Sequence, residues 1–369
     1  MIAATALLVL YLNEPNTILV RDPEGSGDNL ITDNAKALSR GFNSSRELDF
    51  AVIGFPKTGT SFLLEVLGMH PEITMPPTEF CQIHHDNGDK ELVRWMKNQS
   101  SYHPADQKYG IKCPTMVRAT NAIQNLMKVS HQTRLVVGVR HPVLWFQSFY
   151  NYRVFENYND PELNKSSPIQ SPLGLDRTHH WRECSTAYGK FEIFLKQLAK
   201  VSLSSNEMLE MLRSDTLWAK RLTVNPFKVF IYSSDQLDDK NATRQSILRQ
   251  DLKEFLRLDK PLIDFNSVPK VNANNETHPE YINICEPKFA TVRQTLVRSG
   301  RKSRDWILNR FIKSSDVTVS NLEFFKNSLH SWGIDPCTDG FERGREVGER
   351  EKEMKMGNVR LPLAVLTLV

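Results

Sequence analysis

The sequence predicts an α/β fold, in which a parallel β-sheet carries helices on both faces and a helical extension follows at the C-terminus. Two segments, Phe50–Gly54 and Arg134–Val139, are continuous apolar runs with β-branched residues, as is typical of strands that are buried on both faces. A segment with helical apolar spacing follows each run. In such sheets ligands bind at the carboxyl ends of the strands, so residues just beyond these runs are candidate site residues.

Composition places the 369-residue chain among ordinary globular proteins. It is long enough to bury a large core in one α/β domain, and its 40% hydrophobic and 24% charged residues are unexceptional. The net charge of +4 mildly favours anionic ligands. Because the sequence holds no basic stripe interleaved with aromatics, no zinc-type Cys/His spacing and no internal repeat, we expect no nucleic acid, no required metal and no repeat architecture.

We divide the chain into three parts. Residues 1–47 form an apolar segment and a polar stem or linker, 48–337 the main domain, and 338–369 a charged tail that we expect to be disordered. The apolar stretch Ile2–Leu12 is too short to span a bilayer and lacks a basic leading segment. It fits a truncated signal anchor that attaches the protein to a membrane, a poor signal peptide, or a misassigned start.

The loop after the first strand has the features of an anion site. Pro56 and Gly59 interrupt the apolar run, Thr60 and Ser61 suit the start of a helix, and apolar residues then recur at helical spacing. A strand, tight loop and helix in this order direct unpaired backbone N–H groups and the positive end of the helix dipole towards one point. The fold is therefore predicted to be P-loop-like.

The loop differs from the phosphate loop of ATP-binding proteins, Gly-x-x-x-x-Gly-Lys-Ser/Thr. Gly54 and Gly59 have the right separation, but Thr60 follows the second glycine and the lysine, Lys57, lies inside the loop. This argues against an ordinary nucleotide triphosphatase. A plain strand-to-helix connection is the alternative, and the strand–helix context favours the anion site.

The segment Pro56-Lys57-Thr58-Gly59-Thr60-Ser61-Phe62 resembles the 5′-phosphosulfate-binding loop of sulfotransferases that use 3′-phosphoadenosine 5′-phosphosulfate (PAPS). Leu67–Glu72 resembles the Golgi carbohydrate branch, particularly the heparan sulfate type. The resemblance implies PAPS as the sulfuryl donor without a metal. It also implies that residues 58–61, that is Thr58, Gly59, Thr60 and Ser61, hold the donor. Lys57 would stabilise the negative charge on the departing oxygen.

The resemblance assigns a second phosphate site to Arg140 and Ser148. They lie eight positions apart, Arg140 at a strand end and Ser148 about two turns into the next helix, which matches the family's 3′-phosphate motif. A guanidinium offers a bidentate fork to a phosphate and the hydroxyl adds a donor. A surface Arg and a helix-face Ser are the alternative, which the nearby Lys57 loop disfavours.

Glu79 is the candidate general base. It lies 22 residues after Lys57, in a context similar to that of the catalytic Glu of heparan sulfate sulfotransferases, and burial that raised its pKa would suit the role. Cys81 occupies a position where the family often has His, which puts part of the usual support of the base in doubt. His84 and His85 are rival bases, and a solvated loop carboxylate is the non-catalytic alternative.

Three further residues take roles from the resemblance. Lys112, in Ile-Lys-Cys-Pro, resembles a family lysine that reaches the transferring group. Arg301 corresponds to a Gly-Arg loop that covers the donor. Phe62 lies where some relatives keep an adenine-stacking Trp, and a core phenylalanine is an equal alternative. Because Lys57, Lys112 and Arg140 all follow predicted strands, we expect them to converge.

The remaining elements follow from local patterns. The segment Glu72–Asn87 is expected to be irregular, and 156–179 to be a long loop. We expect strands at Tyr109–Lys112 and Lys228–Tyr232, and helices at Asp89–Asn98, Thr115–Val129, Thr186–Lys200, Glu207–Lys220, Thr243–Leu258 and within Lys288–Trp332.

Cysteines and glycosylation signals bear on location. Five scattered cysteines do not form a recognisable disulfide framework, although Cys285 and Cys337 either pair in a lumenal protein or remain two buried thiols. Asn-x-Ser/Thr signals occur at Asn43, Asn98, Asn164, Asn241 and Asn275. With the resemblance, these favour a glycoprotein of the Golgi lumen over a cytoplasmic protein.

The sequence thus predicts a PAPS-dependent sulfotransferase that acts on a hydroxyl, or less readily an amine, of a carbohydrate. One alternative is a P-loop kinase, which the position of Lys57 and the lack of an evident Asp at a strand end disfavour. The other is a catalytically inactive nucleotide- or glycan-binding protein of the same fold.

Overall fold

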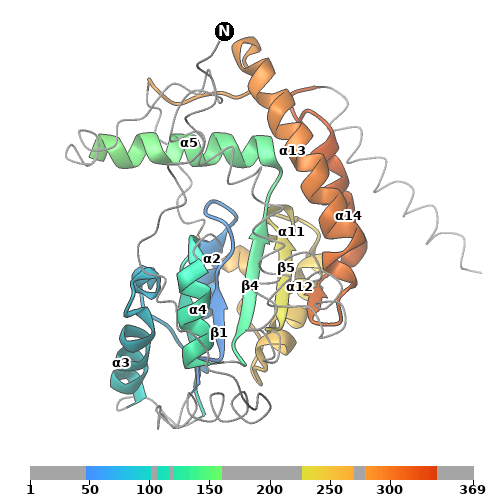
Figure 1. Cartoon of the computed structure of the whole chain (residues 1–369). Coiled ribbons are helices and arrows are strands. Elements are labelled where there is room, and N and C mark those ends of the chain that lie inside the picture. The colour runs from blue at the N-terminus through green and yellow to red at the C-terminus, as the bar shows by residue number, and fades with distance from the viewer. Residues whose placement is uncertain are drawn as a thin grey trace, which may run out of the picture. The chain divides into compact units, whose positions relative to one another are not determined.

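A parallel β-sheet, with helices around it, organises the described part of the chain (Figure 1). The computed structural model describes residues 47–100, 106–116, 120–130, 132–159, 227–269 and 279–338. These residues form a six-stranded sheet in the order β2-β3-β1-β4-β5-β6, and every neighbouring pair is parallel. The strands are β1 (Phe50–Val52), β2 (Ile73–Thr74), β3 (Lys108–Lys112), β4 (Arg134–Val139), β5 (Val229–Ser233) and β6 (Val317–Val319). The predicted α/β class is confirmed.

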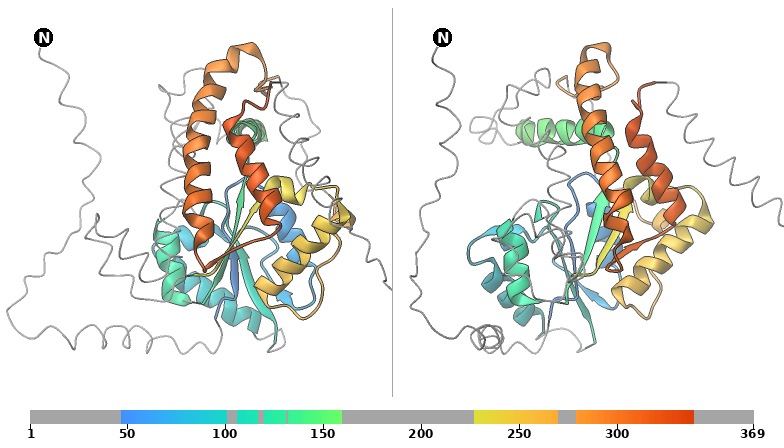
Figure 2. Two further views of the ribbon diagram at one scale, coloured as in Figure 1. Left: turned by 90° about the vertical axis from the view of Figure 1, so that its right-hand side faces the viewer. Right: turned by 45° about the vertical axis from the view of Figure 1, so that its right-hand side comes forward.

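Helices cover both faces of the sheet, as expected (Figure 2). The α-helices are α2 (Thr60–Gly68), α3 (Gly88–Ser100), α4 (Thr120–Val129), α5 (Pro142–Asn159), α11 (Ser234–Leu237), α12 (Ala242–Leu256), α13 (Ala290–Asn309) and α14 (Leu322–His330). Single 3₁₀ turns are η1 (Cys81–His84), η3 (Phe265–Ser267), η4 (Pro287–Phe289), η5 (Phe311–Lys313) and η6 (Ser331–Gly333).

Strand residues alternate between two hydrophobic clusters, one on each face of the sheet. Ala51 belongs to the cluster that contains buried residues of α3, α4, α5, α13 and α14, whereas its neighbours Phe50 and Val52 belong to the cluster with α2, α12 and η3. All three side chains are fully buried. The continuous apolar sequence of β1 therefore follows from burial on both sides.

The chain changes direction between β1 and β4. After β1 it builds β2 and β3 on one side, and after β4 it builds β5 and β6 on the other. Ligands of open parallel sheets bind beside such a point. The two strand ends approach closely, because a Cβ atom on Gly54 would lie 2.1 Å from the backbone N of Gly138.

Contacts from the C-terminal part of the chain fix the start of α5. The ring Nε2 of the buried His141 lies 3.1 Å from the carbonyl oxygens of both Ser331 and Ile334. Arg293 pairs with Asp335 at 2.8 Å. Helices α13 and α14, which run side by side in Figure 2, are thereby attached to the segment that carries Arg140.

The structure corrects several predicted boundaries. It adds two short edge strands, β2 and β6, of two and three residues, which are too short for a periodic pattern to reveal. Helix α5 continues to Asn159, so the loop predicted at 156–179 starts too early, because α5 keeps its helical pattern to that point.

The helices predicted at Thr186–Lys200 and Glu207–Lys220 lie outside the described residues, as do residues 1–46 and 339–369. No described helix has the length and apolar character needed to cross a lipid bilayer.

Four of the five cysteines form disulfides, Cys81–Cys113 and Cys285–Cys337, so the expectation of no framework is wrong. Sequence spacing missed the first pair because its partners, 32 residues apart, meet only when η1 packs beside the end of β3. The second pair is one of the two alternatives that the sequence left open. Cys184 lies outside the described residues.

The close approach at the sheet centre gives a stability prediction. A Cβ atom on Gly138 would lie 2.5 Å from both Thr58 Oγ1 and Tyr232 Oη, so Gly138→Ala should lower the free energy of unfolding by about 1–3 kcal/mol. Gly68→Ala is the matched control, since nothing lies within 4 Å of a Cβ atom there. Chemical denaturation measures both. Equal stability of the two variants would contradict the tight packing of the loop on β4.

Candidate active site

The loop between β1 and α2 adopts a conformation that leaves backbone N–H groups available. Lys57 and Gly59 have φ angles of 64° and 89°, in the left-handed region that residues other than glycine seldom occupy. A Cβ atom on Gly59 would also lie 2.4 Å from Leu237 Cδ1. Helix α2 begins at Thr60, and none of the described side chains caps its N-terminus. The first turn of α2 therefore suits an anion.

Three hydrogen bonds hold the loop in this shape. Trp145 Nε1 of α5 donates to the carbonyl of Pro56 at 2.7 Å, and Arg140 Nη1 donates to the carbonyl of Lys57 at 3.1 Å. The fully buried Thr58 donates its hydroxyl to the carbonyl of Phe55 at 2.7 Å. Loop, strand end and α5 are thus tied into one unit.

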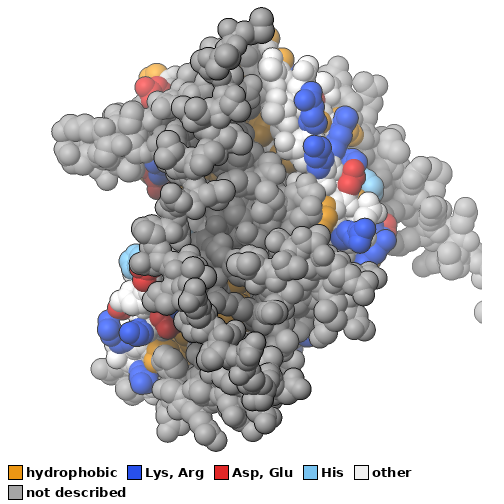
Figure 3. All heavy atoms as spheres, viewed as in Figure 1, with side chains coloured by type: hydrophobic (Ala, Val, Ile, Leu, Met, Phe, Trp, Pro, Cys, Tyr) orange, Lys and Arg blue, Asp and Glu red, His pale blue; other side chains and the backbone are white. Residues whose placement is uncertain are grey.

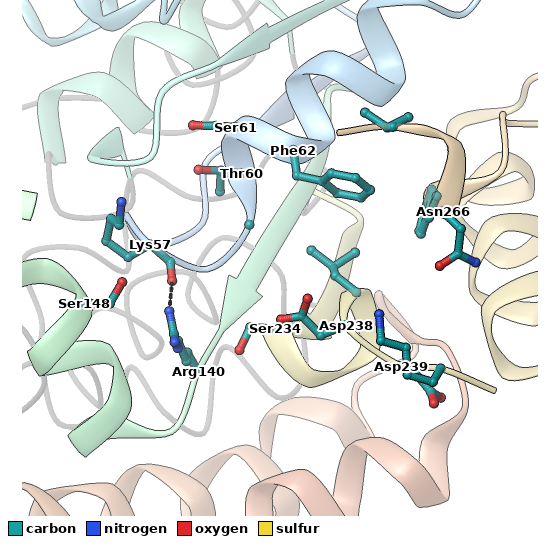
Figure 4. A pocket seen from close by; sticks show the side chains of 15 residues that line it. Lys57, Thr60, Ser61, Phe62, Arg140, Ser148, Ser234, Asp238, Asp239 and Asn266 are labelled. Atoms are coloured by element: carbon teal, nitrogen blue, oxygen red, sulfur yellow. Dashed lines mark hydrogen bonds between the residues drawn. The ribbon is translucent and has the colours of Figure 1, made fainter. Parts of the chain in front are cut away.

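A pocket of about 470 Å³ opens beside this loop (Figure 4), within the usual size range of small-molecule sites. Lys57, Arg140 and Ser148 lie at one end of it, and Phe62 and Asn266 at the other. The complete lining is Lys57, Gly59, Thr60, Ser61, Phe62, Arg140, Ser148, Ser234, Leu237, Asp238, Asp239, Lys240, Phe265, Asn266 and Val268. The pocket combines a cationic end with an end that offers aromatic rings.

The electrostatics of the cationic end favour an anionic ligand. Burial lowers the pKa of the Lys57 amine below its usual value, the positive charge of Arg140 lowers it further, and Glu156 acts in the opposite direction. Two cations held this close repel each other. A bound dianion would relieve that repulsion and stabilise the charged form of Lys57.

A second group of predicted residues, Glu79 and Lys112, contacts the first turn of α2 and does not line the pocket. Lys112 Nζ, which is nearly fully buried, lies 2.5 Å from Glu79 Oε1 and donates to Ser61 Oγ at 3.1 Å. Ser61 belongs to the first turn of α2 and lines the pocket. The candidate base is therefore linked through Lys112 to the phosphate loop.

The segment that carries Glu79 is attached to the end of β3. The N–H of Phe80 donates to the carbonyl of Lys112 at 2.8 Å, and the Cys81–Cys113 disulfide joins the next residues of both segments. Cys81 therefore supports Glu79 covalently, in place of the His that the family often has there. About half of the Glu79 side chain, 48%, is exposed, so the burial expected of a general base is not met.

The two rival bases lie beyond the disulfide. His84 Nε2 is 3.3 Å from Cys113 Sγ and 3.5 Å from Thr115 Oγ1, and His85 is exposed. Like Glu79, neither lines the pocket, but only Glu79 is linked through Lys112 to the lining residue Ser61. Cys81, His84 and Cys113 place potential metal ligand atoms within 4.8 Å of one another, but the disulfide leaves neither sulfur as a thiolate for a metal.

The structure places most of the predicted donor residues in the pocket and two elsewhere. The hydroxyl of Thr58 is bonded within its own loop and its side chain does not line the pocket. Arg301 lies inside helix α13, not in a loop, because the helical pattern runs through Gly300 without a break. Its guanidinium donates to the carbonyl of Gly333 at 3.0 Å and 2.6 Å. The expectation that Arg301 lies in a loop is therefore wrong, while its contact with the donor stays a prediction.

Several lining residues were missed by the sequence reasoning. Ser234 follows β5, a strand that the sequence did predict, so the same strand-end argument that selected Arg140 would have found it. Asp238 and Asp239 also line the pocket, although no Asp was evident at a strand end. Phe265 and Asn266 come from the isolated turn η3, which carries no sequence signal. Phe62 meets Phe265 edge to face, with ring centroids 5.4 Å apart.

Comparisons with known proteins give a family match and a match to a solved structure. Residues 47–205 match the model of the sulfotransferase domain, and no curated protein matches the chain. A solved structure, a sulfotransferase from Alicyclobacillus acidocaldarius, shares 16% identity over 72% of this chain and 97% of its own. The TM-score of that pair is 0.37, too low to support an argument. The matched segment contains Lys57, Glu79, Lys112, Arg140 and Ser148.

Proposed function

We propose that the protein transfers a sulfuryl group from PAPS to a hydroxyl, or less readily an amine, of a carbohydrate. The observation that carries the proposal is the meeting of two anion-binding groups in one pocket. The uncapped start of α2 with Lys57 forms the first group, and Arg140 with Ser148 forms the second. A donor with phosphates at both its 5′ and 3′ positions requires two such groups.

The residues present fit the three parts of PAPS. Backbone N–H groups of the loop and the hydroxyls of Thr60 and Ser61 would hold the 5′-phosphosulfate. Arg140 and Ser148 would hold the 3′-phosphate. The far end of the pocket, with Phe62, Phe265 and the Asn266 amide, suits a planar base that needs ring contacts and hydrogen bonds.

Transfer breaks the bond between sulfur and the bridging oxygen and forms a bond between sulfur and the acceptor oxygen. Lys57 would stabilise the negative charge that develops on the bridging oxygen. Lys112, held between Glu79 and Ser61, would bring a second positive charge to the sulfuryl group. Glu79 would accept the proton of the acceptor hydroxyl, and adenosine 3′,5′-bisphosphate would leave.

The exposed position of Glu79 suits an acceptor that covers it on binding. A sugar chain laid over the site would exclude water from the carboxylate and raise its basicity at the moment of transfer. Lys and Arg side chains also gather over α13 and α14 (Figure 3). The exposed Arg298, Arg301 and Lys302 of α13 would attract a carbohydrate that carries carboxylate or sulfate groups.

A location in the Golgi lumen is part of the proposal. Stable disulfides are rare in the cytosol and common in the secretory pathway. The Cys81–Cys113 and Cys285–Cys337 bonds therefore add support to the resemblance of Leu67–Glu72 to the Golgi carbohydrate branch.

Two aspartates that line the pocket are the observation in favour of the kinase alternative. Asp238 and Asp239 follow α11, and carboxylates near bound phosphates are the usual magnesium ligands of kinases. Asp239, however, pairs with Arg244 at 2.5 Å. A kinase requires magnesium for nucleotide binding, whereas the proposed donor site does not. An inactive binding protein would bind the nucleotide without turnover.

Calorimetric titration in EDTA separates these functions. The purified protein should bind adenosine 3′,5′-bisphosphate more tightly than ADP, because only the bisphosphate reaches Arg140 and Ser148 with a 3′-phosphate. Arg140→Ala should weaken bisphosphate binding about ten- to a hundredfold, as expected for a lost charge-assisted pair. Preference for ADP, or no binding of either ligand, would overturn the proposal.

Two substitutions separate binding from catalysis. Lys57→Ala should lower kcat at least about a hundredfold, since it removes charge stabilisation from the transition state. Glu79→Gln should lower kcat about 100- to 10,000-fold with bisphosphate affinity unchanged, since it removes only the base. Assays of ³⁵S transfer from labelled PAPS to sulfated-glycan acceptors measure both. Turnover of Glu79→Gln within a few-fold of the wild type would assign the base to another residue, His84 or His85 first.

The Cys81–Cys113 bond should matter for turnover more than for donor binding. The double variant Cys81→Ser, Cys113→Ser should lower kcat about ten- to a hundredfold, because the Glu79 segment loses its covalent tie to Lys112. The matched control, Cys285→Ser with Cys337→Ser, should lose about 2–4 kcal/mol of stability with little change in kcat. Equal kcat in both double variants would show that the first disulfide does not position the base.

A further inference from the structure

The amine of Lys57 rests on an aromatic ring that the proposed chemistry has not used. Its Nζ lies 4.5 Å from the centroid of the Tyr152 ring. This is cation–π geometry, in which the negative face of the ring attracts an ammonium group. The left-handed backbone at Lys57 and the hydrogen bond from Arg140 to its carbonyl fix the point from which the side chain starts.

Tyr152 is itself held in place from α5. It lies half-buried on that helix, four residues after Ser148 and four before Glu156, so the three residues share one helix face. Its hydroxyl is hydrogen-bonded to Glu156, and this bond, after burial, raises the pKa of the Tyr152 hydroxyl. Arg153 Nη1 donates in turn to Glu156 Oε2 at 2.6 Å. The ring is therefore anchored at its hydroxyl and presents its face to Lys57.

The helix face thus connects two parts of the site. Ser148 lines the end of the pocket that contains Arg140, and Tyr152 lies one turn further along, against the Lys57 amine. The charge of Glu79 also raises the pKa of the Tyr152 hydroxyl, after burial and Glu156, so the candidate base acts electrostatically on this residue. A group in this position can hold a flexible lysine without competing for its proton.

We propose that Tyr152 is a positioning residue. Its ring holds the Lys57 ammonium where that group can stabilise the negative charge on the departing oxygen. The inference rests on the proposed function and deepens it. Lys side chains carry considerable rotamer freedom, and a ring that restricts the ammonium lowers the cost of placing it in the transition state. Lys57 also belongs to the proposed donor site, but the start of α2, Arg140 and Ser148 remain in place when the ring is lost, so donor affinity should fall less than kcat.

Two variants at the same position separate the ring from the hydroxyl. Tyr152→Phe keeps the ring face and loses the bond to Glu156, and Tyr152→Leu loses the ring. Tyr152→Leu should lower kcat about tenfold with KM for PAPS and bisphosphate affinity little changed, as expected for a cation–π contact of ordinary strength. Tyr152→Phe should stay within about twofold of the wild type in kcat, because the ring remains.

A readout independent of activity is the titration of Lys57. The charged groups that act on its amine are Arg140, Glu156 and Lys112, and all three remain in both variants. Losing the ring removes a contact that favours the ammonium, so Lys57 in Tyr152→Leu should titrate about one pH unit lower than in Tyr152→Phe. Acylation of Lys57 followed by mass spectrometry across pH measures this directly.

The outcomes are distinct. Lower kcat and a lower Lys57 titration midpoint in Tyr152→Leu alone, with donor affinity retained, support the proposal. It is overturned by equal kcat in the two variants, by an unchanged midpoint, or by a loss of bisphosphate affinity that accompanies the loss of kcat. If the wild type binds no bisphosphate, the proposed function fails, while the Lys57 titration still decides whether Tyr152 holds the amine.

Discussion

The packing of one loop on one strand end determines the geometry of the whole site. Gly54 and Gly138 bring β1 and β4 so close that neither position has room for a side chain. Arg140, which follows β4, donates to the carbonyl of Lys57, which follows β1. Because the main chain of the lysine loop and the guanidinium are bonded to each other, the two proposed phosphate sites have a fixed separation. A donor with two phosphates at a defined spacing can exploit such an arrangement.

The segment that carries the candidate base is held in place by different interactions. Glu79 lies on a segment with little regular structure, and its position depends on an ion pair with Lys112, a backbone hydrogen bond and the Cys81–Cys113 disulfide. Lys112 connects this segment to Ser61 in the first turn of α2. The donor site and the candidate base therefore meet at α2, one held by the sheet and the other by a covalent crosslink. This division explains why substitutions on the two sides should separate donor affinity from turnover.

Local patterns predicted the parts of the molecule that depend on local physics. The buried strands β1, β4 and β5 were found because burial on both faces leaves a continuous apolar sequence, and β3 because Pro114 ends a short segment at Lys112. Lys57, Lys112, Arg140 and Ser148 were found because they follow strand ends or a recognisable motif. Edge strands β2 and β6 are too short to carry a pattern. Cys81–Cys113, Phe265, Asn266 and the ring of Tyr152 reach the site only through tertiary packing. Arg301 was expected in a loop because a short sequence motif did not reveal the continuous helix around it.

The central claim is that one pocket holds a nucleotide by two phosphates, without a metal. The most direct measurement is an experimental structure of the protein with adenosine 3′,5′-bisphosphate in the presence of EDTA. The account predicts the 5′-phosphate at the start of α2, the 3′-phosphate between Arg140 and Ser148, and the base beside Phe62, Phe265 and Asn266. A nucleotide bound in the reverse direction, or one that binds only with magnesium at Asp238 and Asp239, would contradict it.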